Sequence, residues 1–98
     1  MNIEKTIENG HFTVKVSGRL DTSTAPELEA ALSEHIDEAD DLVFDLDGLD
    51  YMSSSGLRLL LSCEKKMSAK NGMKVRNVND VIMEIFEVTG FSDILTIE

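Results

Sequence analysis

Three consecutive serines followed by a glycine, Ser53–Ser55 and Gly56, form the densest cluster of potentially reactive side chains in the sequence. A serine between a strand and a helix can act as a hydrolase nucleophile, and its strained turn requires the pattern G-x-S-x-G. Position 52 is methionine, so the glycine that would precede Ser54 in this pattern is missing. The two histidines, His11 and His35, belong to no recognisable triad pattern. We therefore expect no hydrolase and no other enzyme.

A second cluster is acidic: Asp45, Asp47 and Asp50 follow the most continuously apolar strand segment. Sheet folds often place function where strands end, and carboxylate oxygens suit Mg²⁺ or Ca²⁺. The spacing does not match the calcium-loop pattern, because position 49 is leucine. We interpret these residues as loop and turn formers and expect no metal site.

Other cofactor and redox chemistry is equally unsupported. The phosphate-binding patterns G-x-x-x-x-G-K and G-x-G-x-x-G do not occur, so no cofactor is expected. Cys63 lies among apolar residues in the middle of an expected helix. We interpret it as a small core residue and not as a reactive thiol.

The serines also suit the start of a helix. A serine oxygen there can accept a hydrogen bond from an unpaired backbone N–H, which contributes about 1 kcal/mol, and we place Ser54 at or next to this position. A phosphate on Ser54 would lie at the positive end of the helix dipole. It would add roughly −1.5 to −2 charge to a surface already rich in Asp21, Asp47 and Asp50. Taken alone, this chemistry favours capping over phosphorylation.

The elements that would position these serines begin with a hairpin. Residues 3–8 and 12–17 alternate between apolar and polar side chains, which is typical of half-exposed strands. Between them, Asn9 and Gly10 form a two-residue turn that tolerates positive φ. The sequence therefore predicts an antiparallel hairpin.

A helix should follow this hairpin. Thr24 can cap it, Pro26 suits its first turn, and Glu27 can close a capping box. An apolar stripe at three- and four-residue spacing then continues to Ala39. His35 falls at the edge of this stripe, where we expect a packed, partly solvated side chain.

The remainder of the chain alternates between strands and helices. The segment 42–44 is continuously apolar and ends in Asp45 and Leu46, which predicts a strand in the middle of a sheet covered on both sides. This order predicts one α/β domain over residues 1–98, with an initial hairpin and a mixed, largely parallel sheet covered by helices. The other expected elements are a loop at 47–48, a helix from Ser54 to Asn71, a strand at 73–78, a helix capped by Asn79 and ended by Gly90, and a last strand or extended tail at 94–97.

The charge is strongly negative and unevenly distributed. The formal net charge is −10, and all of this excess lies in residues 1–50. Phosphate backbones and anionic lipids repel such a chain, so we expect neither nucleic acid nor a membrane as a partner. The first residues lack the pattern of a secretory signal, and the single cysteine can form no internal disulfide. We expect an intracellular, cytoplasmic protein.

Several segments resemble a known family when they are taken together. The resemblance is to the STAS domain, and more narrowly to bacterial anti-sigma-factor antagonists. It covers essentially the whole chain and implies a fold that agrees with the order of elements given above. The segments that carry it are Gly18–Asp21, Asp45–Leu57, Asn77–Asn79 and Phe86–Phe91.

The resemblance implies a regulatory protein. In this family the antagonist binds an anti-sigma factor, often an ATP-dependent serine kinase, and so frees a sigma factor. The kinase phosphorylates a Ser or Thr at the start of a helix, the phosphorylated antagonist dissociates, and a phosphatase resets it. By position, the acceptor would be Ser54, with Asp21 beside it. The partner-binding residues would be Asp21, Thr22, Ser23, Ser53, Ser55, Gly56, Leu57 and Arg58.

One residue departs from the family pattern. The usual form is Asp-Ser/Thr-Ser-Gly, and Ser53 stands in the place of this Asp. Three adjacent hydroxyls result, which leaves Ser53 and Ser55 as alternative acceptors. The alternative function is a STAS scaffold or accessory subunit that binds its partner constitutively in a transport or signalling complex.

Overall fold

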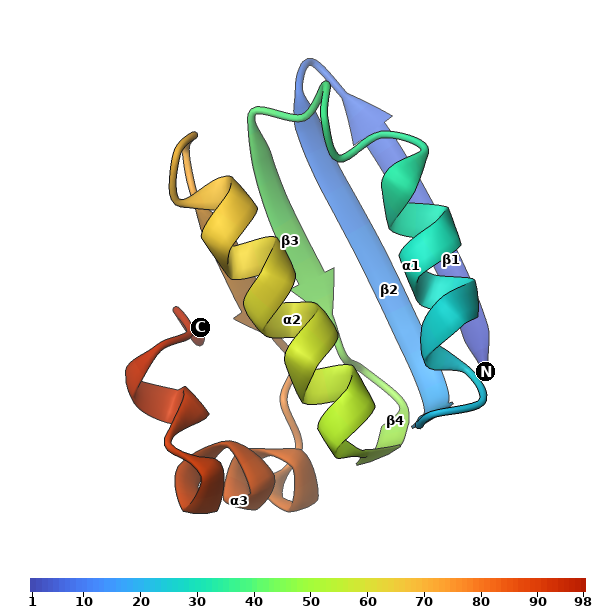
Figure 1. The fold of residues 1–98 in the computed structure, drawn as a ribbon, viewed down its shortest axis with the longest axis vertical. Helices are drawn as coiled ribbons and strands as arrows, with labels where there is room; N and C mark the ends of the chain where they lie inside the picture. The colour runs from blue at the N-terminus through green and yellow to red at the C-terminus, as the bar shows by residue number, and fades with distance from the viewer.

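The N-terminal hairpin forms one edge of a five-stranded sheet in the computed structural model, which describes residues 1–98 (Figure 1). Strand β1 (Asn2–Glu8) pairs antiparallel with β2 (His11–Leu20). Asn9 and Gly10 adopt φ values of 53° and 83°, which a two-residue hairpin turn requires. The predicted hairpin is therefore confirmed.

The remaining strands are parallel to β2. Strand β3 (Asp41–Asp45) pairs with β2, and β5 (Met73–Arg76) pairs with β3, which gives the order β1-β2-β3-β5. The fourth strand, β4 (Leu49–Met52), pairs with the last residues of β2 after a register shift between Gly18 and Arg19. The sheet is mixed and largely parallel, and the predicted fold class is confirmed.

The sequence analysis missed β4. Leu49 and Met52 are buried while the two residues between them are exposed. This spacing has no two-residue period, so the pattern that reveals a strand is missing from the segment. Its partner, the end of β2, is far away in sequence and could not be identified from local pattern.

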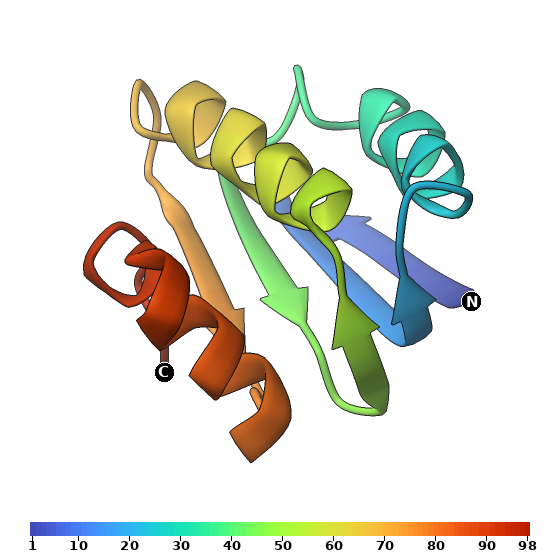
Figure 2. The same cartoon turned by 60° about the horizontal axis from the view of Figure 1, so that its bottom comes forward.

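Helices α1 (Ala25–Ser33) and α2 (Ser54–Met67) lie side by side over one face of the sheet (Figures 1 and 2). Both connections advance across the sheet in the same direction, and right-handed crossovers therefore place both helices on the same face. Helix α3 (Asp80–Thr89) lies apart from them, contacts β4 and is followed by the short helix η1 (Phe91–Asp93) (Figure 2). None of these helices has the length and apolar character needed to span a bilayer.

The core lies between the sheet and this helical layer. Phe12, Val14 and Val16 are fully buried, whereas Thr13 and Lys15, which alternate with them, are half-buried. In β3, Leu42 and Phe44 are buried but Val43 is only half-buried. Strand β3 lies between β2 and β5, in the middle of the sheet as predicted, but its second face is covered less completely, with Val43 half-buried and Asp45 buried.

The helix ends are partly as predicted. Asn79 caps α3 by accepting a hydrogen bond from the Ile82 N–H, and Gly90 ends this helix with φ 82°. The capping box of the first helix does not form, since the Thr24 side chain makes no capping hydrogen bond. Helix α1 also ends at Ser33 and α2 at Met67, earlier than the apolar stripes suggested.

The C-terminal segment begins with a turn at Ile94 and is attached to the sheet at one point. Ile97 forms an isolated parallel bridge with Val75, supported by the Val75 N–H donating to the Thr96 carbonyl. The two alternatives for 94–97, a strand or a tail, are thus resolved in favour of the tail.

Candidate functional site

The parallel strands bring the serine cluster and the Asp21 segment to the same end of the sheet (Figure 1). Strand β2 runs into the loop 21–24, and β4, parallel to it, runs into the first turn of α2. The Ser53 N–H donates to the Leu20 carbonyl over 2.9 Å, which joins the two chain segments. Open parallel sheets place binding sites at this end.

Gly56 allows the first turn of α2 to lie close to the sheet. A Cβ at this position would lie 2.8 Å from Cγ of both Leu20 and Met52, which are themselves buried. Only glycine fits this gap without displacing the helix. Gly56 therefore fixes the height of the neighbouring serines above the sheet.

The three serines have three different environments. Ser53 is the N-cap of α2, and its hydroxyl accepts a hydrogen bond from the Ser55 N–H over 3.2 Å. The Ser55 hydroxyl is bonded to two other side chains. Ser54, the first residue of the helix, is exposed, and its hydroxyl takes part in none of these bonds. Ser54 therefore lies next to the N-cap, within the prediction, and Ser53 is the cap itself.

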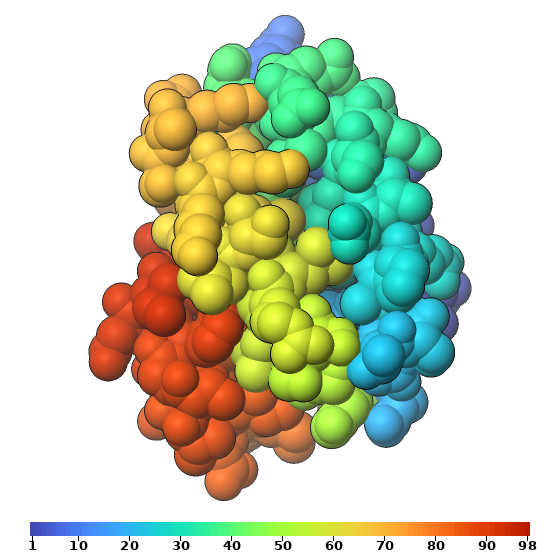
Figure 3. Space-filling model, in the orientation of Figure 1, coloured from blue at the N-terminus to red at the C-terminus, as the bar shows by residue number.

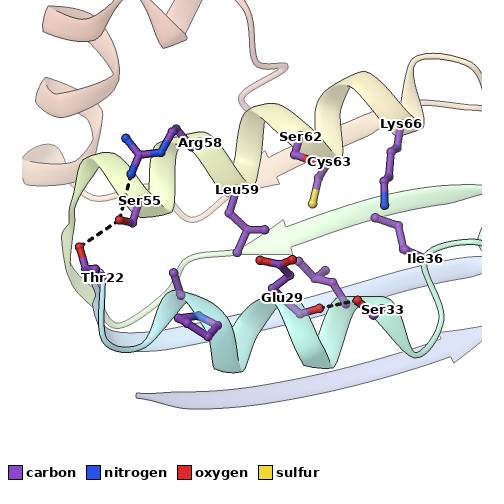
Figure 4. A pocket seen from close by; sticks show the side chains of 13 residues that line it. Thr22, Glu29, Ser33, Ile36, Ser55, Arg58, Leu59, Ser62, Cys63 and Lys66 are labelled. Carbon is purple, nitrogen blue, oxygen red and sulfur yellow. Dashed lines mark hydrogen bonds between the residues drawn. The ribbon is translucent and has the colours of Figure 1, made fainter.

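Ser55 connects the two helices at their entry. Its Oγ lies 3.0 Å from the Thr22 Oγ1 and accepts a hydrogen bond from the Arg58 Nη2 over 3.3 Å (Figure 4). The chain of polar groups thus runs from the loop before α1 to the second turn of α2. It brings together three of the residues predicted to bind a partner.

Asp21 organises its own loop and the start of α1. Its Oδ1 accepts hydrogen bonds from the Ser23 hydroxyl over 2.7 Å and from the N–H groups of Ser23 and Thr24. The Ser23 hydroxyl bond, together with the backbone donors, outweighs partial burial and holds the pKa of Asp21 below its ordinary value of 3.8. Asp21 is thus a stable anion at this end of the sheet.

Two further residues belong to this region and were not predicted. The guanidinium of Arg19 lies 4.4 Å from the ring centroid of Tyr51, and its Nε is 3.8 Å from Asp21 Oδ2. Arg19 and Tyr51 are register partners in the β2–β4 pair. Sequence analysis could find this pair only by finding β4, which it missed.

A family model for the STAS domain matches residues 2–98 of the chain. The chain belongs to the STAS domain family.

Relatives with this domain carry related names. This STAS domain is 35% identical over 97 residues to an anti-sigma-B factor antagonist of Staphylococcus aureus, covering 97% of this chain and 90% of the relative. It superposes on an anti-sigma factor antagonist from Mycobacterium paratuberculosis with a TM-score of 0.88, at 27% identity and covering 98% of this chain and 83% of the other. The predicted family, including its group of anti-sigma-factor antagonists, is confirmed.

A more distant neighbour shows the fold alone. The unphosphorylated form of SpoIIAA, an anti-sigma factor antagonist, matches this STAS domain with a TM-score of 0.83 at 18% identity, covering 99% of this chain and 88% of the other. The phosphorylated form of the Bacillus SpoIIAA matches with a TM-score of 0.76, also at 18% identity, covering 99% of this chain and 91% of the other.

A groove of about 360 Å³ lies between α1 and α2 of this STAS domain, on the face shown in Figure 3. Thr22, Ser55 and Arg58 line one end of it. The Cys63 sulfur points into the groove (Figure 4), but the residue is only 3% exposed. Burial raises the pKa of the Cys63 thiol to about 11, as suits the predicted core residue.

Two of the predicted partner-binding residues lie beneath the surface. Gly56 is buried and Leu57 is only 8% exposed. They support the first turn of α2 from within, while Thr22, Ser23, Ser54 and Arg58 are exposed. The predicted part of Gly56 and Leu57 in partner binding stays a prediction.

The acidic cluster has a structural role in this STAS domain. Asp45 is buried, and its oxygens accept hydrogen bonds from the Asn77 side chain, the Asp47 N–H and Arg76 Nε. Burial alone would raise the pKa of Asp45, but these hydrogen bonds outweigh it and lower the pKa. No group of three or more His, Cys, Asp or Glu side chains has the arrangement of a metal site.

The histidines lie in contacts unrelated to the serine cluster. His11 Nδ1 is 2.7 Å from Asp41 Oδ2, and the His35 ring packs edge-on against Phe12. His35 is partly exposed, as predicted. Neither histidine is bonded to a serine.

Proposed function

We propose that this protein is an anti-sigma factor antagonist whose binding is switched by phosphorylation of Ser54. The relatives with the same domain are named anti-sigma factor antagonists. The observation that carries the choice of Ser54 is its exposed hydroxyl at the first residue of α2, which no protein group occupies. Ser53 and Ser55 use their hydroxyls to hold the site together.

The docking surface in this proposal is the end of the sheet around Ser54. It comprises the exposed residues Thr22, Ser23 and Arg58 together with the anionic Asp21. An anti-sigma factor that binds there would release its sigma factor. The protein would act in the cytoplasm, as one domain spanning residues 1–98.

The anti-sigma factor would itself be the kinase. In the transfer, the Ser54 Oγ attacks the γ-phosphorus of ATP, the bond to the leaving ADP breaks, and the hydroxyl proton passes to a base of the kinase. A phosphatase would later hydrolyse the phosphoserine and restore the hydroxyl. This STAS domain is the substrate of both steps and supplies no catalytic group.

Ser53 in place of the usual Asp is compatible with this role. Ser and Asp are comparably good N-caps, and the Ser53 hydroxyl makes the capping bond to the Ser55 N–H. The substitution therefore preserves the helix start that presents Ser54. It removes one negative charge beside the acceptor, so the unmodified site is more nearly neutral.

The energetic requirement of the switch is modest. A hundredfold loss of affinity corresponds to about 2.7 kcal/mol of binding free energy. A phosphate adds about −1.5 to −2 charge at the centre of a surface that was neutral at this position. Desolvating that charge in an interface shaped for a hydroxyl can supply the difference.

Phosphosite mapping tests the acceptor. Each anti-sigma kinase encoded in the source genome is purified and incubated with ATP and the wild type or the variants Ser53→Ala, Ser54→Ala and Ser55→Ala. We expect phosphate on Ser54 by mass spectrometry, and loss of phosphorylation only in Ser54→Ala. Phosphorylation that persists in Ser54→Ala would assign the role to another residue.

A binding titration tests the switch. Calorimetry with the same kinase should show at least a tenfold weaker complex for Ser54→Asp than for wild type, with Lys65→Gln as a control that changes net charge equally at the far end of α2. Equal affinity of wild type and Ser54→Asp would support the constitutive scaffold instead. Binding by none of the kinases would contradict the proposed partner class.

A further inference from the structure

The three arginines of the chain differ in their partners. Arg19 lies against Tyr51 with its Nε 3.8 Å from an Asp21 oxygen, and Arg76 is 3.4 Å from Asp45. Arg58 forms no ion pair, although the chain has nineteen acidic residues and only nine basic ones. In so acidic a protein, an arginine without a carboxylate partner is a feature that needs an explanation.

Arg58 is placed next to the Ser54 hydroxyl by helix geometry. Both residues are in α2, four positions apart, and side chains at this spacing are neighbours on the helix surface. An anion that precedes a cation by four residues is also the favourable orientation with respect to the helix dipole. Both side chains are exposed, so nothing in the protein blocks an approach of one to the other.

The present partner of Arg58 holds it weakly. One Nη2 donates to the Ser55 Oγ over 3.3 Å, which is at the long end of hydrogen-bond distances. A guanidinium has five N–H donors, so most of its donor capacity is unused by the protein. A phosphate offers charged acceptor oxygens that bind a guanidinium through two parallel bonds.

We propose that Arg58 is the residue that holds the phosphate on Ser54. The guanidinium leaves the Ser55 hydroxyl and pairs with the phosphate oxygens within the same helix face. This inference rests on the proposed phosphorylation of Ser54 and adds the residue that responds to it. Arg58 is a positioning residue here, since it takes no part in the phosphoryl transfer.

The consequence is a change at two points of the docking surface. Phosphorylation adds a charged group at position 54 and withdraws the Arg58 guanidinium from the surface around Ser55. The Ser55 hydroxyl keeps only Thr22 as a side-chain partner. A partner that uses Arg58 as a hydrogen-bond donor therefore loses this contact when the phosphate is added.

Other cations are less well placed. The Arg19 guanidinium is already against Tyr51 and near Asp21. Lys66 is on the same helix but twelve residues after Ser54, which is about 18 Å along the axis at roughly 1.5 Å per residue. Lys66 is therefore a suitable control for the loss of one positive charge from α2.

The test uses phosphoserine installed at position 54 by genetic-code expansion, so it needs no kinase. The second ionisation of the phosphate is followed by ³¹P NMR between pH 4 and 8. A neighbouring guanidinium favours the dianion, so removing it should raise the phosphate pKa. We expect Arg58→Gln to raise it by about half a pH unit, which corresponds to the energy of an exposed ion pair. Lys66→Gln should leave it within about a tenth of a unit, because its charge is distant and screened.

A conservative variant and a second signal sharpen the result. Arg58→Lys keeps the charge but loses the paired geometry. We therefore expect its phosphate pKa to lie between those of wild type and Arg58→Gln. In wild type, the ¹⁵N resonance of Arg58 Nε should move on phosphorylation. Equal shifts in Arg58→Gln and Lys66→Gln would overturn the inference.

The outcomes separate this inference from the proposed function. A phosphate pKa that depends on Arg58, with no kinase that modifies Ser54, would support the pairing and contradict the phosphorylation switch. Phosphorylation of Ser54 by a kinase, with a phosphate pKa that does not depend on Arg58, would support the phosphorylation switch and contradict the pairing.

Discussion

Helices α2 and α3 both begin with a side-chain N-cap, but they differ in the charge of their first turn. Each has a polar N-cap in extended conformation whose side chain accepts a hydrogen bond from the first turn: Ser53 from the Ser55 N–H, and Asn79 from the Ile82 N–H. Asn79 also donates to the Leu49 carbonyl over 2.7 Å, and the residue after it, Asp80, supplies a negative charge at the positive end of the helix. Helix α2 has no acidic residue in its first turn.

The start of α1 is also anionic. Asp21 accepts from the N–H groups of Ser23 and Thr24, and Glu27 lies in the first turn. Of the three α-helices, only α2 therefore begins without a carboxylate. Its positive end is compensated by a neutral hydroxyl, and a phosphate on Ser54 would supply the missing anion. The difference agrees with the proposed phosphorylation of Ser54, which would add a negative charge to the start of α2.

The largest expected effect concerns what holds the start of α2, which is close packing. Gly56→Val would place side-chain atoms within the buried space of Leu20 and Met52, and overpacking of this kind costs about 3 kcal/mol. We expect the free energy of unfolding from urea denaturation to fall by this amount. In Gly56→Ala the free energy of unfolding should fall less, because a single Cβ requires a smaller displacement of the neighbouring side chains. Wild-type stability in Gly56→Val would show that packing does not position this helix.

The start of α3 should depend on its cap more strongly than α2 does. Asn79→Ala removes the acceptor for the Ile82 N–H and the donor to the Leu49 carbonyl. The loss of a cap together with an unsatisfied carbonyl should cost about 2 kcal/mol in urea denaturation. Asn79→Asp retains the acceptor, so its free energy of unfolding should lie between those of Asn79→Ala and wild type. If Asn79→Ala lost no more unfolding free energy than Ser53→Ala, the caps of α2 and α3 would contribute equally to stability, contrary to this prediction.

At α2 the cap, Ser53, and the proposed phosphorylation site, Ser54, are separate residues. Ser53→Ala removes the capping bond and should cost about 1 kcal/mol of unfolding free energy. Ser54→Ala, the matched control one residue later, should change it by less than about 0.5 kcal/mol, because the Ser54 hydroxyl has no partner to lose. Ser53→Asp should have the same free energy of unfolding as wild type, since Ser and Asp are both good N-caps. A larger loss in Ser54→Ala than in Ser53→Ala would return the capping role to Ser54.

The sequence was sufficient to predict the outline of the fold. Strands β2 and β5 and all three α-helices have the expected periodicity, because each buries one regular set of apolar side chains, whereas β3 was found from its continuous apolar run. Strand β4 has no such period, so it was missed together with the pair of Arg19 and Tyr51 that it creates.

Within the serine cluster, composition predicted the chemistry but not its assignment. All three serines can cap a helix, and a shift of one residue in the helix start exchanges the roles of Ser53 and Ser54. The start is set by Gly56 against Leu20 and Met52. The contact between Gly56 and Leu20 joins residues 36 positions apart (56 − 20), so local pattern does not contain it.

The smallest expected effect concerns the anion at the start of α1, which faces the start of α2. The Ser23 hydroxyl and backbone donors lower the pKa of Asp21 in the folded protein below 3.8. A depressed pKa means that the stabilisation is fully present above the unfolded value of 3.8 and is lost as the pH falls through the folded value. We expect the difference in unfolding free energy between wild type and Asp21→Asn to be constant from pH 7 to 5 and to shrink below pH 4.

Asp21→Asn is the appropriate variant, because its amide oxygen can still accept the loop hydrogen bonds while the charge is absent at every pH. Urea denaturation of both proteins at each pH cancels the titration of the other carboxylates. A difference that stays constant down to pH 2 would show that Asp21 acts by shape alone, and that the contrast between charged and neutral helix starts does not extend to α1.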